Sequence, residues 1–166
     1  EARPGAVLHR TTGALTMRAV LQRVSGASVH IGGAEHARIG RGLLLLLGGE
    51  VGDSISEAEW LCGKIARMRI FPDADGVMNL DITQVGGEVL LVSQFTLQAS
   101  TAKGNRPSYI RAARPEEAIP LYLRVKQLLT EAVGRPVRTG EFGADMQVEL
   151  VNDGPVTIVI DSRLRE

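Results

Sequence analysis

The sequence contains little cysteine and few aromatic residues, and each scarcity excludes a class of protein. Cys62 is the only cysteine, which rules out an intrachain disulfide framework and a multi-cysteine zinc site. A single cysteine also fits a reducing compartment such as the cytosol. Aromatic residues make up 4% of the chain, which argues against a surface that stacks bases on several exposed rings.

The chain also lacks an excess of charge and a long hydrophobic run. Its 19 basic and 19 acidic residues cancel, so net charge indicates neither a dedicated DNA binder nor a membrane-surface protein. The longest aliphatic run, Leu43–Leu47, is far shorter than the roughly 20 residues that a membrane-spanning helix needs. Hydrophobic residues reach 44%, enough for a folded core. We therefore expect one folded domain with no membrane partner and no DNA partner.

Residues 1–16 differ from the rest in showing no apolar periodicity and no signal-peptide core. We interpret them as an N-terminal extension, an expression remnant or the product of an upstream start, with a transit peptide as an alternative because the segment is basic and nearly free of acids. Residues 17–166 form the expected domain.

Strand patterns recur along this domain. Apolar alternation predicts half-buried strands, and the Gly-Gly pair at 32–33 predicts a hairpin. The run Leu43–Leu47 predicts a strand buried on both faces. The predicted strands are 19–24, 27–31, 35–39, 43–47, 88–95, 147–151 and 156–160.

Two helices are expected between these strands. The first begins at the capping-box serine Ser54 and ends near Arg69. The second begins after Pro115 or at Pro120 and ends at Gly134. Two helices cannot cover both faces of a large sheet. We therefore expect an α/β fold, a single β-rich domain with two packed sheet layers and helices on one side.

The usual catalytic and metal-binding motifs are absent from the sequence. The aspartates Asp73 and Asp75 resemble the start of a calcium loop, but no glutamate follows at its twelfth position. Cys62 lies on the apolar stripe of the first helix, which favours a buried small side chain over a nucleophile. We expect surface or packing roles for the histidines and neither a metal nor a cofactor. The histidines are His9, His30 and His36.

Three polar segments remain, and residue chemistry leaves two interpretations open for each. The segment SQFTL, residues 93–97, is either a site at a strand end or simply a strand that turns polar. NDGPVT, residues 152–157, is either a hairpin turn or a cis Gly–Pro bond that shapes a pocket. Residues 103–114 carry four cations and no acid, and these either bind an anionic partner or are solvated.

These segments together resemble the D-aminoacyl-tRNA deacylase family. The match begins at MRAVLQRVSGASV, includes SQFTL, KGNRPSY and GEFGADMQVELVNDGPVT, and covers nearly all of 17–161 in the expected order. Two small departures, Val77 and Tyr109, fall outside the signature motifs SQFTL and NDGPVT.

The resemblance implies a cytoplasmic homodimer of β-rich α/β fold that hydrolyses the ester between a D-amino acid and the terminal ribose of tRNA, and that also removes mischarged glycine. It implies that the Gly–Pro motif has a cis bond and enters the partner's site. The catalytic segment carried over is Ser93, Gln94, Phe95 and Thr96. The chiral-selection residues are Gly154, Pro155 and Arg23, the last holding the motif. We assign Lys103 and Arg106 to tRNA binding, because they lie in the acid-free stretch.

An aminoacyl ester is already activated, so a neighbouring ribose hydroxyl and backbone oxyanion donors near Phe95 and Thr96 would suffice without a strong base. We expect Thr96 to line or orient the pocket, with a nucleophilic role as the lesser option. Two alternatives stay open: a nucleic-acid-binding module without catalysis, and an ordinary esterase that uses Thr96 or Ser93.

Overall fold

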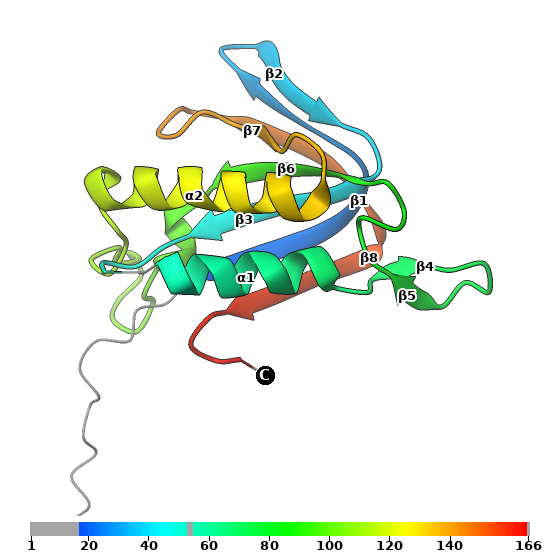
Figure 1. Cartoon of the computed structure of the whole chain (residues 1–166). Coiled ribbons are helices and arrows are strands. Elements are labelled where there is room, and N and C mark those ends of the chain that lie inside the picture. Colours follow the sequence, from blue (N-terminus) through cyan, green and yellow to red (C-terminus); the bar gives the residue numbers. More distant parts are fainter. Residues whose placement is uncertain (1–16, 53–54, 166) are drawn as a thin grey trace, which may run out of the picture.

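The computed structural model describes residues 17–52 and 55–165, which form a mixed β-sheet with both helices on one face (Figure 1). The strand order is β2-β1-β3-β6-β7, and β8 pairs with the other side of β1. The expected extension 1–16 lies outside the described residues. The bounds are β1 Arg18–Ile31, β2 Ala34–Ile39, β3 Gly42–Gly48, β6 Glu88–Ser93, β7 Arg138–Thr139 and β8 Gln147–Asp161.

The predicted fold class, a β-rich α/β domain with two sheets and helices on one side, is confirmed. The second sheet is a small ribbon of β4, Phe71–Pro72, and β5, Met78–Leu80. Asp73 shapes its turn, because its carboxylate accepts backbone N–H groups from Asp75 and Val77 at 2.9 and 3.0 Å. The aspartates are therefore turn residues, as expected.

The helices are α1, Ile55–Arg67, and α2, Pro115–Val133. Ser54, the predicted cap of α1, lies outside the described residues, and α1 ends two residues before Arg69. The second helix begins at Pro115 and continues through Pro120, so Pro115 was the correct alternative. In the described part of the chain, neither helix is long and apolar enough to cross a membrane.

The leucine run of β3 serves two cores, as predicted. Leu43, Leu45 and Leu47 face the helices, whereas Leu44 and Leu46 face the opposite side. There the sheet curls on itself, and residues of β2 and β6 cover those two leucines. Each buried leucine contributes roughly 1.5–3 kcal/mol, so this short strand anchors both layers.

The end of the chain differs from the prediction of two closing strands. One continuous strand, β8, runs antiparallel to β1 along its whole length, so the hairpin-turn interpretation of residues 152–157 is wrong. The pairing of β8 with β1 shifts register on both sides of Val24, and these shifts accommodate residues 152–157 within the strand. The Asn152 amide replaces ladder bonds there, accepting from Val156 N–H at 2.8 Å and donating to the Val156 carbonyl oxygen at 3.1 Å.

Candidate active site

The polar motif SQFTL lies where β6 ends. Ser93 is the last residue of β6, two residues earlier than predicted, and Phe95 begins the short 3₁₀ helix η1, Phe95–Gln98. Gln94 N–H donates to the Leu47 carbonyl oxygen at 2.7 Å, which extends the pairing with β3 by one residue. Leu97 N–H then donates back to the Gln94 carbonyl oxygen at 3.2 Å. The motif is therefore a strand end followed by a tight turn.

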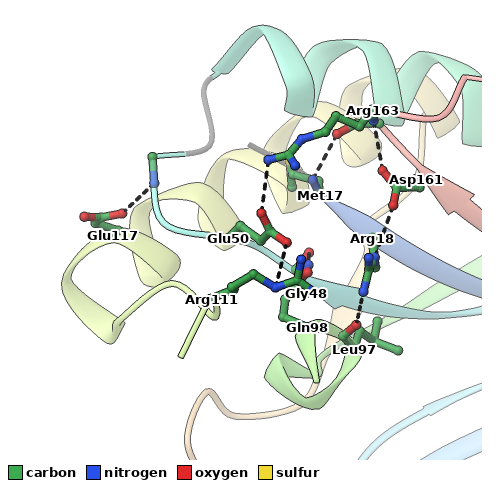
Figure 2. A network of polar contacts seen from close by, with 12 residues as sticks. Met17, Arg18, Gly48, Glu50, Leu97, Gln98, Arg111, Glu117, Asp161 and Arg163 are labelled. Atoms are coloured by element: carbon green, nitrogen blue, oxygen red, sulfur yellow. Dashed lines mark hydrogen bonds and ion pairs between the residues drawn. The ribbon is translucent and has the colours of Figure 1, made fainter. Parts of the chain in front are cut away.

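Close packing against β3 fixes this turn in place. A Cβ atom on Gly48 would lie 2.8 Å from the Gln94 carbonyl oxygen and 3.1 Å from Leu97 Cβ, so only glycine fits there without a shift. The buried Gln98 amide donates to the Gly48 carbonyl oxygen at 3.1 Å. Arg18 Nη1 donates to the Leu97 carbonyl oxygen at 2.9 Å (Figure 2). Contacts from β1 and β3 thus hold η1.

A cavity of about 320 Å³ opens beside this segment. Ser93, Gln94 and Phe95 form one wall, and Phe142–Met146 with Val92 and Val148 form the rest. Thr96 is not among the lining residues, and its hydroxyl accepts a hydrogen bond from the Gln94 amide. Three of the four predicted catalytic residues therefore meet at one cavity.

The wall formed by Phe142–Met146 was missed as a functional segment. It joins β7 to β8, and its glycine-rich sequence GEFGADM carries no chemical signature of its own. The only available signal was its place in the family resemblance.

The Gly–Pro motif lies elsewhere on the chain. Gly154 and Pro155 are exposed, the bond between them is cis, and neither residue lines the cavity beside Ser93. Arg23 holds the motif from behind, because its Nε donates to the Asp153 carbonyl oxygen at 2.7 Å. A single chain therefore does not bring the two signature motifs to one cavity.

Arg23 itself is 8% exposed and reaches a second carbonyl group. Its Nη1 donates to the Ile70 carbonyl oxygen at 2.6 Å, and its Nε lies 3.8 Å from the Asp153 carboxylate. The Arg23 guanidinium thus links β1 to Ile70, the residue before β4, and to Asp153 in the middle of β8.

The basic loop, residues 103–114, contacts the cavity wall through a pair of aromatic rings. Lys103 and Arg106 are exposed, as expected for cations that bind an anion or are solvated. Tyr109, at the end of the same loop, packs edge-on against Phe95, with ring centroids 5.2 Å apart.

Titratable groups with strongly raised pKa values lie in the core. Burial raises the pKa of the Cys62 thiol to about 12, so it stays protonated and is a poor nucleophile, as predicted. Burial also raises the pKa of Tyr122 to about 12, and its hydroxyl donates to the Leu91 carbonyl oxygen at 3.1 Å. Among residues 17–52 and 55–165, no group of three His, Cys, Asp or Glu side chains is placed to hold a metal ion.

Comparison with known proteins gives one consistent result. The family model described as D-Tyr-tRNA(Tyr) deacylase matches residues 20–161. A protein of Akkermansia muciniphila named D-aminoacyl-tRNA deacylase is 61% identical over 150 residues, covering 90% of this chain and all of the relative. Proteins of the same name from Porphyromonas gingivalis and Bacteroides thetaiotaomicron are 59% and 56% identical with the same coverage.

Two solved structures share the fold of this chain. The structure titled "c-Myc DNA Unwinding Element Binding Protein" is 40% identical, with a TM-score of 0.82, and the match covers 86% of this chain and 97% of that one. A structure of a probable eukaryotic D-amino acid tRNA deacylase is 17% identical, with a TM-score of 0.76 and coverage of 88% and 99%, which shows a shared fold.

Proposed function

Because the chain belongs to the D-Tyr-tRNA(Tyr) deacylase family, we propose that it hydrolyses the ester between a D-amino acid and the terminal ribose of tRNA. The chain is an ester hydrolase of the D-aminoacyl-tRNA deacylase type. The observation that carries the proposal is the cavity walled by Ser93, Gln94 and Phe95 in a chain with such relatives. The cytoplasm, where tRNA is charged and used, is the proposed location.

Hydrolysis at this site rests on positioning and on oxyanion donors. Water adds to the ester carbonyl carbon, the ester C–O bond breaks, and the ribose oxygen leaves with a proton passed through the neighbouring ribose hydroxyl. We assign the Phe95 and Thr96 N–H groups to the oxyanion, because the first N–H groups of a helix have no acceptor within it. Thr96 orients the wall, since its hydroxyl is held by the Gln94 amide.

Steric exclusion of L side chains accounts for selectivity. A wall that blocks the direction of an L side chain admits D-amino acids and glycine alike, so mischarged glycyl-tRNA is also a proposed substrate. Gly154 and Pro155 form this wall in the proposal, and they are supplied by a second copy of the chain. Two observations support this role: the pair is exposed, and Arg23 holds the segment rigidly through Asp153.

A homodimer completes each site in this scheme. β8 carries the Gly–Pro pair and pairs with β1 along one edge. Its outward face exposes Val151 and Val159 by 64% and 69%. Exposed apolar area of this kind is suited to burial against a twofold-related copy.

Lys103 and Arg106 are proposed to contact tRNA phosphates. Both are exposed and belong to the loop whose Tyr109 packs against Phe95. An RNA strand bound at the cavity would therefore pass near them.

Deacylation of matched D- and L-tyrosyl-tRNA tests the activity. The expected result is release of D-tyrosine with L-tyrosyl-tRNA spared, and equal rates on the two enantiomers would sink the proposal; glycyl-tRNA, assayed in the same way, should also be hydrolysed. Replacing the neighbouring ribose hydroxyl with hydrogen should abolish turnover. Retained turnover would favour the ordinary esterase that uses Thr96 or Ser93, and tRNA binding without any turnover would favour the pure binding module.

A further inference from the structure

Two of the few aromatic rings meet at the surface beside the cavity. Phe95 is 54% exposed and Tyr109 39%, and their ring planes meet at 75°. Ile110, the next residue, is 86% exposed. Low aromatic content argued against a platform of several rings, yet the structure places two rings in contact beside the cavity, with an exposed aliphatic residue next in the chain.

The loop presents Tyr109 in a defined position. Before the ring, Ser100 and Ser108 exchange backbone hydrogen bonds of 2.8 and 2.9 Å. After the ring, Arg111 forms an ion pair with the buried Glu50, with Nε and Oε1 3.9 Å apart (Figure 2). Because contacts fix the chain on both sides of Tyr109, the residue loses little conformational freedom when a ligand stacks on its ring.

Tyr109 lies within a basic segment of the chain. Residues 103–114 contain Lys103, Arg106, Arg111 and Arg114 and no acidic residue. Exposed rings beside a basic stretch are the arrangement that binds single-stranded nucleic acid, because bases stack on the rings and cations contact the phosphates. Arg111 is ion-paired with Glu50, and the positive charge of the other three cations favours an anionic strand such as RNA.

We propose that Tyr109, in contact with Phe95, stacks on the base that precedes the terminal nucleotide in the unpaired 3′ strand of tRNA. This inference rests on the proposed function. Phe95 lines the cavity and Tyr109 does not, so Tyr109 lies one ring farther out. The cavity of about 320 Å³ is at the small end of ligand sites and takes the acyl group with the terminal nucleoside. The preceding base then lies outside, over Tyr109.

Two substrates distinguish stacking from a structural role. For Tyr109→Leu we expect KM for D-tyrosyl-tRNA to rise about tenfold, the order of magnitude that one lost base–ring stack produces. The rate on D-tyrosyl ester of the terminal nucleoside alone should stay within about twofold, since that substrate has no preceding base. Tyr109→Phe should behave as the unsubstituted protein, and Leu123→Ala, on the similarly exposed Leu123 of α2, should change neither substrate. An equal loss on both substrates, or no loss on either, overturns the inference.

Binding of uncharged tRNA gives a test that does not depend on catalysis. Removing the unpaired 3′ nucleotides should weaken binding to the unsubstituted protein about tenfold more than it weakens binding to the Tyr109→Leu variant, because both proteins lose the terminal nucleoside but only the unsubstituted one loses the stack. Equal weakening in both proteins overturns the inference. So does an altered sedimentation coefficient for Tyr109→Leu, which would place the ring in a contact between copies. If neither ester is hydrolysed but the binding difference is found, the proposed function fails and the stacking site stands.

Discussion

At the scale of single residues, Arg23 fixes the segment next to the Gly–Pro motif through its side-chain hydrogen bonds. Arg23→Met would leave the Asp153 and Ile70 carbonyl groups without their donor, so we expect the free energy of unfolding to fall by about 2–4 kcal/mol. Release of residues 153–155 should also let L-tyrosyl-tRNA be hydrolysed. Urea unfolding and paired deacylation assays measure the two effects.

A matched control for this prediction is Arg38→Met. Arg38 is an exposed arginine of β2, and its replacement should cost less than about 0.5 kcal/mol. If Arg23→Met left both stability and enantiomer preference unchanged, Arg23 would not be holding the motif.

The buried Cys62 and Tyr122 predict how stability depends on pH. Burial raises the pKa of Cys62 from 9.0 to about 12 and that of Tyr122 from 10.0 to about 12. The folded state therefore binds more protons than the unfolded state between about pH 9 and 12. The contribution of these groups to the free energy of unfolding is fully present below pH 9 and falls as pH rises through that window. The slope reaches at most about 1.4 kcal/mol per pH unit for each group.

Urea unfolding at pH 8, 9 and 10 measures this slope. Between pH 9 and 10 the thiol dominates, so Cys62→Ala should show a flatter dependence on pH than the unsubstituted protein, whatever its absolute stability. Parallel slopes for the two proteins would mean that the folded chain tolerates the thiolate.

At the scale of elements, the contact between β3 and η1 positions the site. In Gly48→Ala the new methyl group would meet the Gln94 carbonyl oxygen and displace the turn that carries Phe95 and Thr96. We expect kcat/KM to fall at least about tenfold while stability falls by about 1–3 kcal/mol, the usual cost of overpacking. Gly40→Ala is the matched control, because its Cβ would meet only the Glu88 carboxylate, at an ordinary 3.7 Å. Equal activity in both variants would contradict a positioning role for this contact.

Sequence patterns predicted the elements whose signals are local. The Gly-Gly turn at 32–33 has φ of 59° and 80°, a conformation that favours glycine, and it joins β1 to β2 as expected. The run Leu43–Leu47 was recognisable as a doubly buried strand because every position is aliphatic. The strand that ends at Ser93 was found for a similar reason, because its aliphatic run is unbroken, although its predicted end at Phe95 was two residues too late.

The elements that sequence analysis missed depend on distant partners. Gly154 and Pro155 are turn-forming residues, yet β8 continues through them because Asn152 supplies side-chain hydrogen bonds and β1 shifts register to match. The cavity wall at Phe142–Met146 faces Ser93 only through the folding of the chain. Neither feature leaves a periodic signal, so local patterns could not reveal it.

At the scale of the whole molecule, a neutral chain concentrates cations in one loop. If Lys103 contacts a tRNA phosphate, Lys103→Ala should weaken binding of every tRNA alike and reduce the slope of log K against log salt by about one unit. Lys64→Ala is the control, because Lys64 is an exposed cation of α1 outside the basic loop. Binding titrations from low to moderate salt measure the slopes, and identical slopes for both variants would mean that the loop charge is only solvated.

The proposed dimer predicts that one copy controls the selectivity of the other. Pro155→Ala removes the ring from the excluding wall, so this variant should hydrolyse L-tyrosyl-tRNA. A second variant, with Gln94→Ala and Thr96→Ala, keeps the normal Gly–Pro pair but has an impaired cavity wall.

When the second variant is mixed in excess and subunits exchange, each intact cavity receives a normal Gly–Pro wall from its partner. L-tyrosyl-tRNA hydrolysis per Pro155→Ala chain should then fall toward the level of the unsubstituted protein while D-tyrosyl-tRNA hydrolysis persists. Light scattering confirms that mixed dimers form. If they form and L-tyrosyl-tRNA hydrolysis does not fall, the wall acts within its own chain and the shared site is wrong.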